Sequence, residues 1–196
     1  GQPGSFNTIE NCNMYTASGN VGPYYGVTLS GNTSNYTTIG QNNTLKGSTM
    51  KNFYYYGVYQ AYTNGNQIVN NDISRANATS GGSSSLYAIF SSYSYSTSRS
   101  TQLNGNAIHD LPFAGATTLT SNLSSFYLIY NYYPYGNTTY RTQMLGNNMY
   151  NIFSTTSTTY GIYAYYPQYI DVQNNVIDNI QSSGASATNY MMYLYY

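Results

Sequence analysis

Ionisable side chains are the residues best suited to carry out chemistry, and this chain contains few of them. Its 196 residues include five acidic side chains, five basic side chains and one histidine. The acidic residues are Glu10, Asp72, Asp110, Asp171 and Asp178, and the basic residues are Lys46, Lys51, Arg75, Arg99 and Arg141. Hydrolysis of a polysaccharide needs two carboxylates at a suitable separation. The acidic residues fall at different positions of the repeat described below, so the sequence predicts no catalytic carboxylate pair.

His109, which is followed by Asp110, forms the one neighbouring pair that could suggest acid–base chemistry, with Arg75 expected one repeat away. A histidine beside an aspartate on an outward strand or loop is usually a solvated pair, and we expect no catalytic residue. Zinc needs clustered cysteine or histidine, and the chain has one of each. Calcium-binding nonapeptide repeats are absent. We therefore expect no metal ion and no cofactor. The single cysteine, Cys12, is expected to be a small buried side chain rather than a reactive thiol.

The low charge of the chain excludes several classes of partner. Only 5% of the residues are charged and the formal net charge is zero, against roughly 25% charged residues in ordinary soluble proteins. Nucleic acids and anionic membranes both require a basic surface, so neither is an expected partner. No run of about 18 apolar residues is present, and we expect no insertion into a membrane. The chain begins at Gly1 without a visible signal peptide, which indicates a mature product or a segment of a longer chain.

A two-residue corner recurs along the sequence, and an apolar residue stands two positions after each corner. The corners are Asn11-Cys12, Asn42-Asn43, Asn70-Asn71, Gly105-Asn106, Gly146-Asn147 and Asn174-Asn175. Asn and Gly best tolerate the positive φ that a tight bend between strands requires. Stacked corners would let the amides of successive repeats bond to one another. We predict an asparagine ladder, interrupted at its start by Cys12, that consists of Asn43, Asn71, Asn106, Asn147 and Asn175. Leu45 is the apolar residue that follows the second corner. In the other coils an apolar residue stands three positions before the second residue of the corner, whereas Ile39 stands four positions before Asn43, which suggests a bulge there.

A second recurring feature is a strand rich in tyrosine. The chain contains 28 tyrosines. The central residues of this strand are Val27, Val58, Ile89, Ile129, Ile162 and Met192, and the residues two positions earlier are Tyr25, Tyr56, Tyr87, Tyr127, Tyr160 and Tyr190. Period-two alternation predicts that these tyrosines share the inward direction of the central residues or lie at the rim of the core. Positions one and three beyond the centre should point outward and form two aromatic columns, which include Tyr59, Phe90, Tyr130, Tyr163 and Tyr193, and Tyr132, Tyr165 and Tyr195.

These outward columns are the candidate surface for a ligand or for lateral contact with another protein. Tyrosine combines a flat apolar ring with a polar tip, which suits both sugars and protein partners. Stacked aromatic rings would equally stabilise the fold itself, and the sequence leaves these alternatives open.

Both features recur together from one end of the chain to the other, which predicts a repeat architecture. The segment 160–180 contains two alternating runs, a corner and a further apolar–polar run, the pattern of three short strands. We predict one all-β domain spanning residues 1–196, a right-handed parallel β-helix of about six coils with three strands each. Ser-, Thr- and Gly-rich runs, among them residues 78–85, 154–159 and 182–188, should form loops at one corner.

The pattern resembles the right-handed β-helices of the pectate-lyase-like type, which also carry an asparagine ladder. The phrases YGIYAYYPQYIDVQNNVIDNI and GNNMYNI resemble repeats in large secreted surface proteins of Bacteroidota. That resemblance implies an extracellular or cell-surface location. We expect a non-enzymatic structural β-solenoid, a segment of a rod or filament that either associates with further copies end to end or continues end to end within a longer chain. The alternatives are a carbohydrate-binding adhesin that uses the tyrosine columns, and an atypical enzyme similar to polysaccharide lyases.

Overall fold

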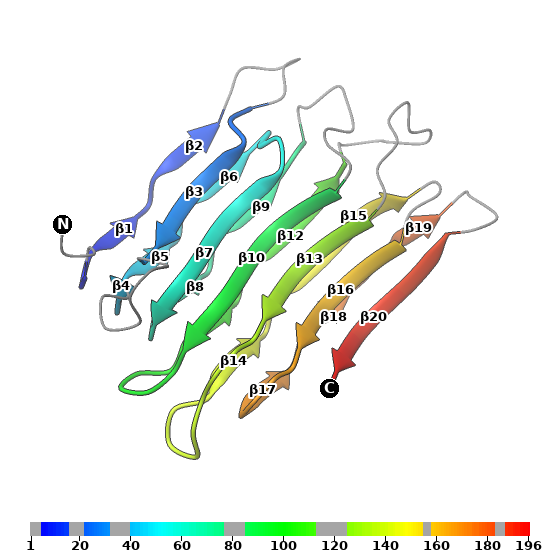
Figure 1. Cartoon of the computed structure of the whole chain (residues 1–196). Coiled ribbons are helices and arrows are strands. Elements are labelled where there is room, and N and C mark those ends of the chain that lie inside the picture. The colour runs from blue at the N-terminus through cyan, green and yellow to red at the C-terminus, as the bar shows by residue number, and fades with distance from the viewer. Residues whose placement is uncertain are drawn as a thin grey trace.

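The chain winds into three parallel β-sheets that enclose one long core (Figure 1). The structure, a computed structural model, describes residues 5–15, 22–31, 40–76, 85–112, 125–154, 158–182 and 187–196. Within these ranges every element is a strand and every pairing between strands is parallel. Six coils follow one another, and equivalent residues of successive coils lie 36, 23, 35, 41 and 28 residues apart. The predicted right-handed parallel β-helix is confirmed.

Each coil contributes one strand or strand pair to each sheet. Sheet A contains β1 (Thr8–Glu10), β5 (Thr44–Lys46), β8 (Gln67–Val69), β11 (Gln102–Asn104), β14 (Thr142–Leu145) and β17 (Ile170–Gln173). Sheet B contains β2 (Asn13–Tyr15), β6 (Thr49–Lys51), β9 (Asp72–Ser74), β12 (Ala107–Leu111), β15 (Asn148–Ser154), β18 (Val176–Ile177) and β19 (Ile180–Ser182). Sheet C contains β3 (Tyr25–Ser30), β7 (Tyr56–Asn64), β10 (Ser85–Tyr95), β13 (Ser125–Tyr132), β16 (Thr158–Tyr165) and β20 (Thr188–Tyr195), with the short β4 (Gly40–Gln41) beside β7.

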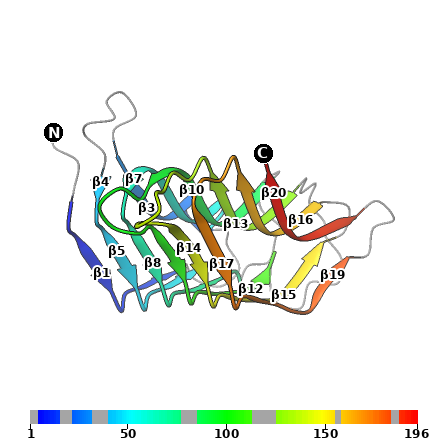
Figure 2. The same ribbon diagram turned by 90° about the horizontal axis from the view of Figure 1, so that it is seen from below.

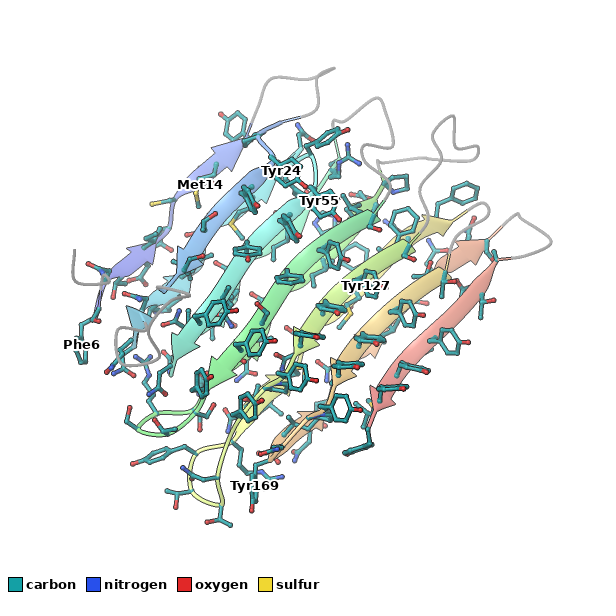
Figure 3. The ribbon with its side chains drawn as sticks, in the orientation of Figure 1. Phe6, Met14, Tyr24, Tyr55, Tyr127 and Tyr169 are labelled. Atoms are coloured by element: carbon teal, nitrogen blue, oxygen red, sulfur yellow. The ribbon has the colours of Figure 1, made fainter. Side chains whose placement is uncertain are left out.

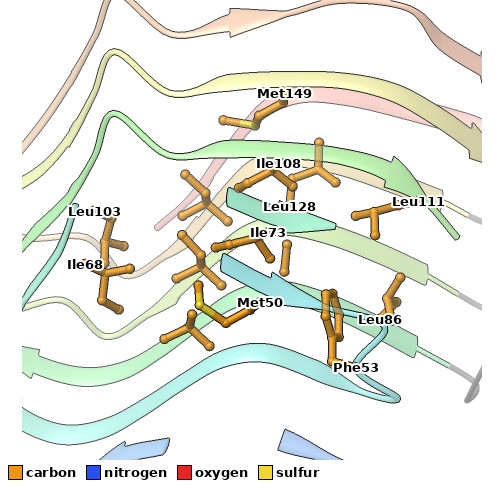
Figure 4. Packing of buried hydrophobic residues seen from close by; sticks show 14 of the residues in the cluster. Met50, Phe53, Ile68, Ile73, Leu86, Leu103, Ile108, Leu111, Leu128 and Met149 are labelled. Atoms are coloured by element: carbon orange, nitrogen blue, oxygen red, sulfur yellow. The ribbon is translucent and has the colours of Figure 1, made fainter. Parts of the chain in front are cut away.

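Figure 2 shows sheets A and B meeting at a sharp edge while the longer strands of sheet C form the opposite wall. The core between them consists of like residues stacked on like. Sheet A supplies Ile9, Leu45, Ile68, Leu103, Met144 and Val172, which lie opposite one another in the strand register. Sheet B supplies Met14, Met50, Ile73, Ile108, Met149 and Ile177. Figure 4 shows this packing in the central coils, where these side chains are fully buried. A single coil could not bury its own apolar face, so the stability of each coil depends on its neighbours.

The asparagine ladder lies at the edge between sheets A and B. Asn106 Oδ1 accepts hydrogen bonds from the backbone N and from Nδ2 of Asn71, at 3.1 and 3.0 Å. Asn147 Oδ1 likewise accepts hydrogen bonds from N and Nδ2 of Asn106, at 2.9 and 3.1 Å. Asn175 Oδ1 accepts them from N and Nδ2 of Asn147, at 2.9 and 2.8 Å. Each side chain therefore satisfies the buried backbone of the adjacent corner, which would otherwise lack a partner.

The assignment of Asn43 to this ladder was wrong. Leu45 pairs with Ile68, so it belongs to the sheet A column, and the corner of the second coil is Gly47-Ser48. Ser48 replaces asparagine in the ladder and receives a hydrogen bond from the backbone N of Cys12 at 3.2 Å, while its own N bonds to Asn71 Oδ1 at 3.0 Å. Asn43 belongs to a second ladder, between sheets C and A, where its N bonds to Asn66 Oδ1 at 2.9 Å.

Three further expectations require correction. Cys12 is exposed rather than buried. The bulge inferred from Ile39 rested on the misplaced corner, and Ile39 itself lies outside the described residues. Of the Ser-, Thr- and Gly-rich runs predicted as loops, residues 78–84, 155–157 and 183–186 also lie outside those residues, as does the segment 113–124. The loop prediction was wrong at the ends of these runs, where Ser85, Ser154, Thr158, Thr159, Ser182 and Thr188 belong to strands.

Candidate functional site

The outer side of sheet C carries a nearly continuous layer of aromatic rings, which we call the tyrosine face (Figure 3). Its first column consists of the tyrosines two positions before each central residue. In Tyr87, Tyr127 and Tyr160 the ring centroids lie 4.7 and 4.8 Å apart with planes within 4° of parallel. Tyr25 and Tyr56 extend the stack in one direction and Tyr190 in the other, with centroid spacings of 5.1 to 5.2 Å.

The sequence predicted that this first column points inward or lies at the rim of the core, and the inward direction was wrong. In β10 the alternation of burial is broken at Ala88 and Ile89, which are adjacent and both fully buried, so Tyr87 faces outward. The position before each central residue consequently lies inside and needs a small side chain in several coils. A Cβ added to Gly57 would lie 2.6 Å from the Ala88 carbonyl oxygen and 2.7 Å from Ile73 Cγ2. The recurring glycine was the signal in the sequence for two successive inward residues.

The second column consists of the predicted outward residues one position beyond the centre. Tyr59, Phe90, Tyr130, Tyr163 and Tyr193 stack with centroid spacings of 5.0 to 5.4 Å and planes within 12° of parallel. The two columns contact each other edge to face, as in Tyr87 and Phe90 at 5.3 Å and 88°. Offset stacking and edge-to-face contacts are the preferred geometries of aromatic pairs.

Further columns lie towards the end of the strands. Tyr132, Tyr165 and Tyr195, predicted to point outward, stack at 4.9 and 5.0 Å. A column that sequence reasoning missed consists of Tyr62, Tyr93, Tyr133 and Tyr166, which stack at 5.0 to 5.5 Å and all have φ of 47° to 53°. The sequence signal was available, because these tyrosines stand four positions beyond the central residues Val58, Ile89, Ile129 and Ile162.

The stacking decides what this surface offers to a ligand. Rings follow one another along the rod, so a ring within a column has both of its faces against its neighbours in the adjacent coils. The surface therefore consists of ring edges and phenol hydroxyls. A sugar that stacks on tyrosine needs an uncovered ring face. Among the rings of the described columns, such faces remain only where a column ends, as at Tyr190, Tyr193 and Tyr195.

The tyrosine face is electrically neutral. None of the strands β3, β7, β10, β13, β16 and β20 contains a Lys, Arg, Asp, Glu or His residue. Burial, reinforced by the neighbouring phenols, raises the pKa of Tyr56, Tyr87 and Tyr130 well above the ordinary value, and it raises the pKa of Tyr163 to about 12. The phenols consequently remain protonated at physiological pH and keep both a donor and an acceptor.

His109 lies on the outer side of sheet B within a small charged cluster. Its Nδ1 is 2.7 Å from Asp110 Oδ2 and its Nε2 is 2.9 Å from Asp72 Oδ1, while Lys51 Nζ is 3.9 Å from Asp72 Oδ2. The imidazole stacks on the ring of Tyr150, with centroids 4.8 Å apart. A general base must have a free lone pair directed at its substrate. Both ring nitrogens of His109 face carboxylate oxygens, so neither is directed at solvent.

Arg75, expected near His109, is fully buried, and its burial lowers the pKa of the guanidinium to about 10. Among the described His, Cys, Asp and Glu side chains no group is arranged to hold a metal ion.

An open hollow of about 600 Å³ lies where sheets C and A meet. Residues of two loops line it, Ser98, Arg99 and Ser100 from one and Thr139 and Tyr140 from the other, together with Phe6, Asn42 and Gln102. Arg99 is held by the carbonyl oxygen of Asn42 at 3.2 Å and by Thr44 Oγ1 at 3.4 Å. Unlike Lys46, Lys51 and Arg141, it forms no ion pair with a described carboxylate. This hollow, which sequence reasoning missed, could hold a polar ligand with a negative group.

Within the described ranges, no helix has the length and apolar character that a membrane-spanning segment requires. No family model matches the chain, and no curated protein matches it. Among solved structures it is similar to the surface protein and adhesin PfbA of Streptococcus pneumoniae, with 12% sequence identity and a TM-score of 0.38. The alignment covers 95% of this chain and 49% of that chain, so the chain spans about half the length of PfbA in that structure.

Proposed function

We propose that this chain is a non-enzymatic structural β-solenoid, a rigid rod segment of an extracellular or cell-surface assembly. One observation carries the proposal: like residues stack coil on coil both in the core and on the tyrosine face. The side chains of both layers are therefore engaged by their counterparts in neighbouring coils instead of being directed at a substrate. The extracellular location rests on the resemblance of the repeats to those of secreted surface proteins.

The distribution of the acidic residues supports a non-enzymatic role. Glu10 pairs with Lys46 at 2.9 Å and Asp171 with Arg141 at 2.7 Å. Asp72 and Asp110 both bond to His109. Four of the five carboxylates thus have a cationic or imidazole partner, and catalysis would require these contacts to be given up. Turnover of a uronic-acid polymer by the purified chain would contradict the proposal.

End-to-end association of such rods is supported by the face of the last coil. An apolar hollow of about 350 Å³ lies there, lined by residues that include Ile162, Val172, Ile177, Met191 and Met192. Met192 occupies the central position that is filled by fully buried isoleucine in the three preceding coils, yet it is 49% exposed. The open strand edges and apolar side chains of this face suit a further coil, and we propose that such a coil covers it, either the first coil of a second copy or the continuation of the rod in a longer chain.

Sedimentation analysis tests this association. The 196-residue chain should form an open series of species whose mean mass rises with concentration. Met192→Glu should stop the growth, because the interface would then bury an unpaired carboxylate. Val69→Glu is the matched control, since Val69 lies on the outer side of sheet A in a middle coil, away from both ends of the rod. Growth that persists in Met192→Glu would show that this face is not the contact.

Glycan binding is a second candidate, favoured by the Arg99 hollow rather than by the tyrosine columns. The hollow combines a guanidinium, several hydroxyl and amide groups, and the exposed ring of Phe6. These groups suit an acidic saccharide. Binding on a glycan array that is lost in Arg99→Ala and kept in a triple Tyr-to-Ala variant at Tyr130, Tyr163 and Tyr193 would support the hollow. The reverse outcome would favour the columns.

A further inference from the structure

The tyrosine face has the size of a protein–protein interface. Its strands are mostly eight or more residues long, and six of them lie side by side. With a rise of about 3.3 Å per residue and a strand spacing of about 4.8 Å, the face measures roughly 26 by 29 Å, or about 750 Å². A standard interface buries about 800 Å² on each partner. An aromatic surface of this extent commonly marks a site of association.

The chemistry of the face favours a partner with the same chemistry. Because its strands contain no ionisable residue other than tyrosine, a charged partner would have its charges desolvated without compensation. A phenol both donates and accepts hydrogen bonds. Two tyrosine faces can therefore satisfy each other, whereas a surface of carboxylates or ammonium groups could not satisfy itself.

The stacking also lowers the entropic cost of association. Rings such as Tyr130 and Tyr163 are already fixed by stacked neighbours, at 5.0 and 5.1 Å for Tyr130 and at 5.0 and 5.4 Å for Tyr163, and both make edge-to-face contacts with Tyr127. Side chains that are ordered before binding lose little rotamer freedom when the interface forms. The face is thus preorganised.

We propose that the tyrosine face is covered in solution by the tyrosine face of a second copy of this chain, related by a two-fold axis. The contact joins two rods side by side and closes at a dimer, because an isologous interface uses the same surface on both copies. It is separate from the end-to-end association described above, which uses the face of the last coil and is open.

The two contacts can be tested independently in variants that lack one of them. In the Met192→Glu background, sedimentation equilibrium across the micromolar range should show a monomer–dimer equilibrium that stops at the dimer. Adding Tyr163→Glu should weaken the dimer at least tenfold, because each copy would then bury a carboxylate in the interface without a counter-ion. Adding Tyr15→Glu instead should leave it unchanged. A Met192→Glu protein that is monomeric at every concentration would overturn the proposal, as would a dimer indifferent to Tyr163→Glu.

Hydroxyl-radical footprinting, which oxidises accessible rings whether or not the phenol is ionised, provides a second measurement should the Tyr163→Glu variant fail to fold, as judged by circular dichroism. In the Met192→Glu protein, tyrosines of the face, such as Tyr130 and Tyr163, should become protected as concentration rises. Tyr15 and Tyr169, which are exposed elsewhere on the molecule, should remain reactive. Equal reactivity of Tyr163 at low and high concentration would contradict the dimer.

Discussion

Removal of one side chain from the middle of the asparagine ladder should destabilise the whole rod. Asn106 is fully buried, and its side chain makes four hydrogen bonds: Oδ1 accepts from Asn71 N and Nδ2 at 3.1 and 3.0 Å, and Nδ2 donates to Ile68 O at 3.0 Å and to Asn147 Oδ1 at 3.1 Å. Asn106→Ala removes all four and leaves the buried backbone N of Asn71 without an acceptor.

The expected loss follows from these contacts. Each of the four hydrogen bonds contributes about 1 kcal/mol, and a buried group left without a partner costs about 1–3 kcal/mol, so Asn106→Ala should lower the free energy of unfolding by about 5–7 kcal/mol. That is a large part of the roughly 5–15 kcal/mol by which domains are stable. The backbone of residue 106 is not in the left-handed region, so alanine introduces no strain there.

Urea denaturation followed by circular dichroism measures the change, with Asn175→Ala as the matched control. Asn175 occupies the same ladder position in the last coil and makes three such bonds, at 2.8 to 2.9 Å, but it is only partly buried. Water can replace its lost partners, and the expected loss is about 1–2 kcal/mol. Equal losses in the two variants, or a loss below about 1 kcal/mol for Asn106→Ala, would refute the view that buried amide ladders secure the coils.

Three other measurements test the packing and electrostatics of the same rod. Gly57→Ala should destabilise the fold by about 1–3 kcal/mol, because the new methyl would overlap the Ala88 carbonyl and Ile73; unchanged thermal unfolding would contradict the tight packing of neighbouring coils. Tyr130→Ala should cost about 2–4 kcal/mol through lost burial and stacking, whereas Tyr130→Phe should stay within about 0.5 kcal/mol, and equal effects would show that the hydroxyl rather than the ring matters. Spectrophotometric titration should show the phenol of Tyr163 ionising near pH 12, above the ordinary tyrosine value of 10. Because its pKa is raised in the folded state, its contribution to stability is complete below pH 10 and is lost as the pH rises towards 12, so the rod should unfold in alkali; ordinary titration of all tyrosines in the folded protein would contradict this.

Much of the architecture was readable from the sequence because a β-helix repeats its local rules in every coil. Corners that need positive φ select Asn or Gly, as at Asn70, Gly105 and Gly146, and alternation marks the strands between them. The ladder from Asn71 to Asn175 and the outward direction of the second tyrosine column both follow from these local rules.

Coil register was less accessible, as the second coil shows. Asn42-Asn43 has the letters of the ladder corner, but the hydrogen bonds place Asn43 against Asn66 at a different edge of the rod. Coil lengths range from 23 to 41 residues, so similar corners at two edges could not be distinguished by spacing. The contact between His109 and Asp72 was likewise hidden, because it joins neighbouring coils 37 residues apart.

The sequence by itself determined the strands, the corners and the repetition, since these depend on backbone conformation and on the polarity of adjacent residues. Only the tertiary structure decided which way the first tyrosine column points and that ring faces are covered within the columns. Those features depend on two successive inward residues and on the distance between coils, and both are set by packing against the neighbouring coil.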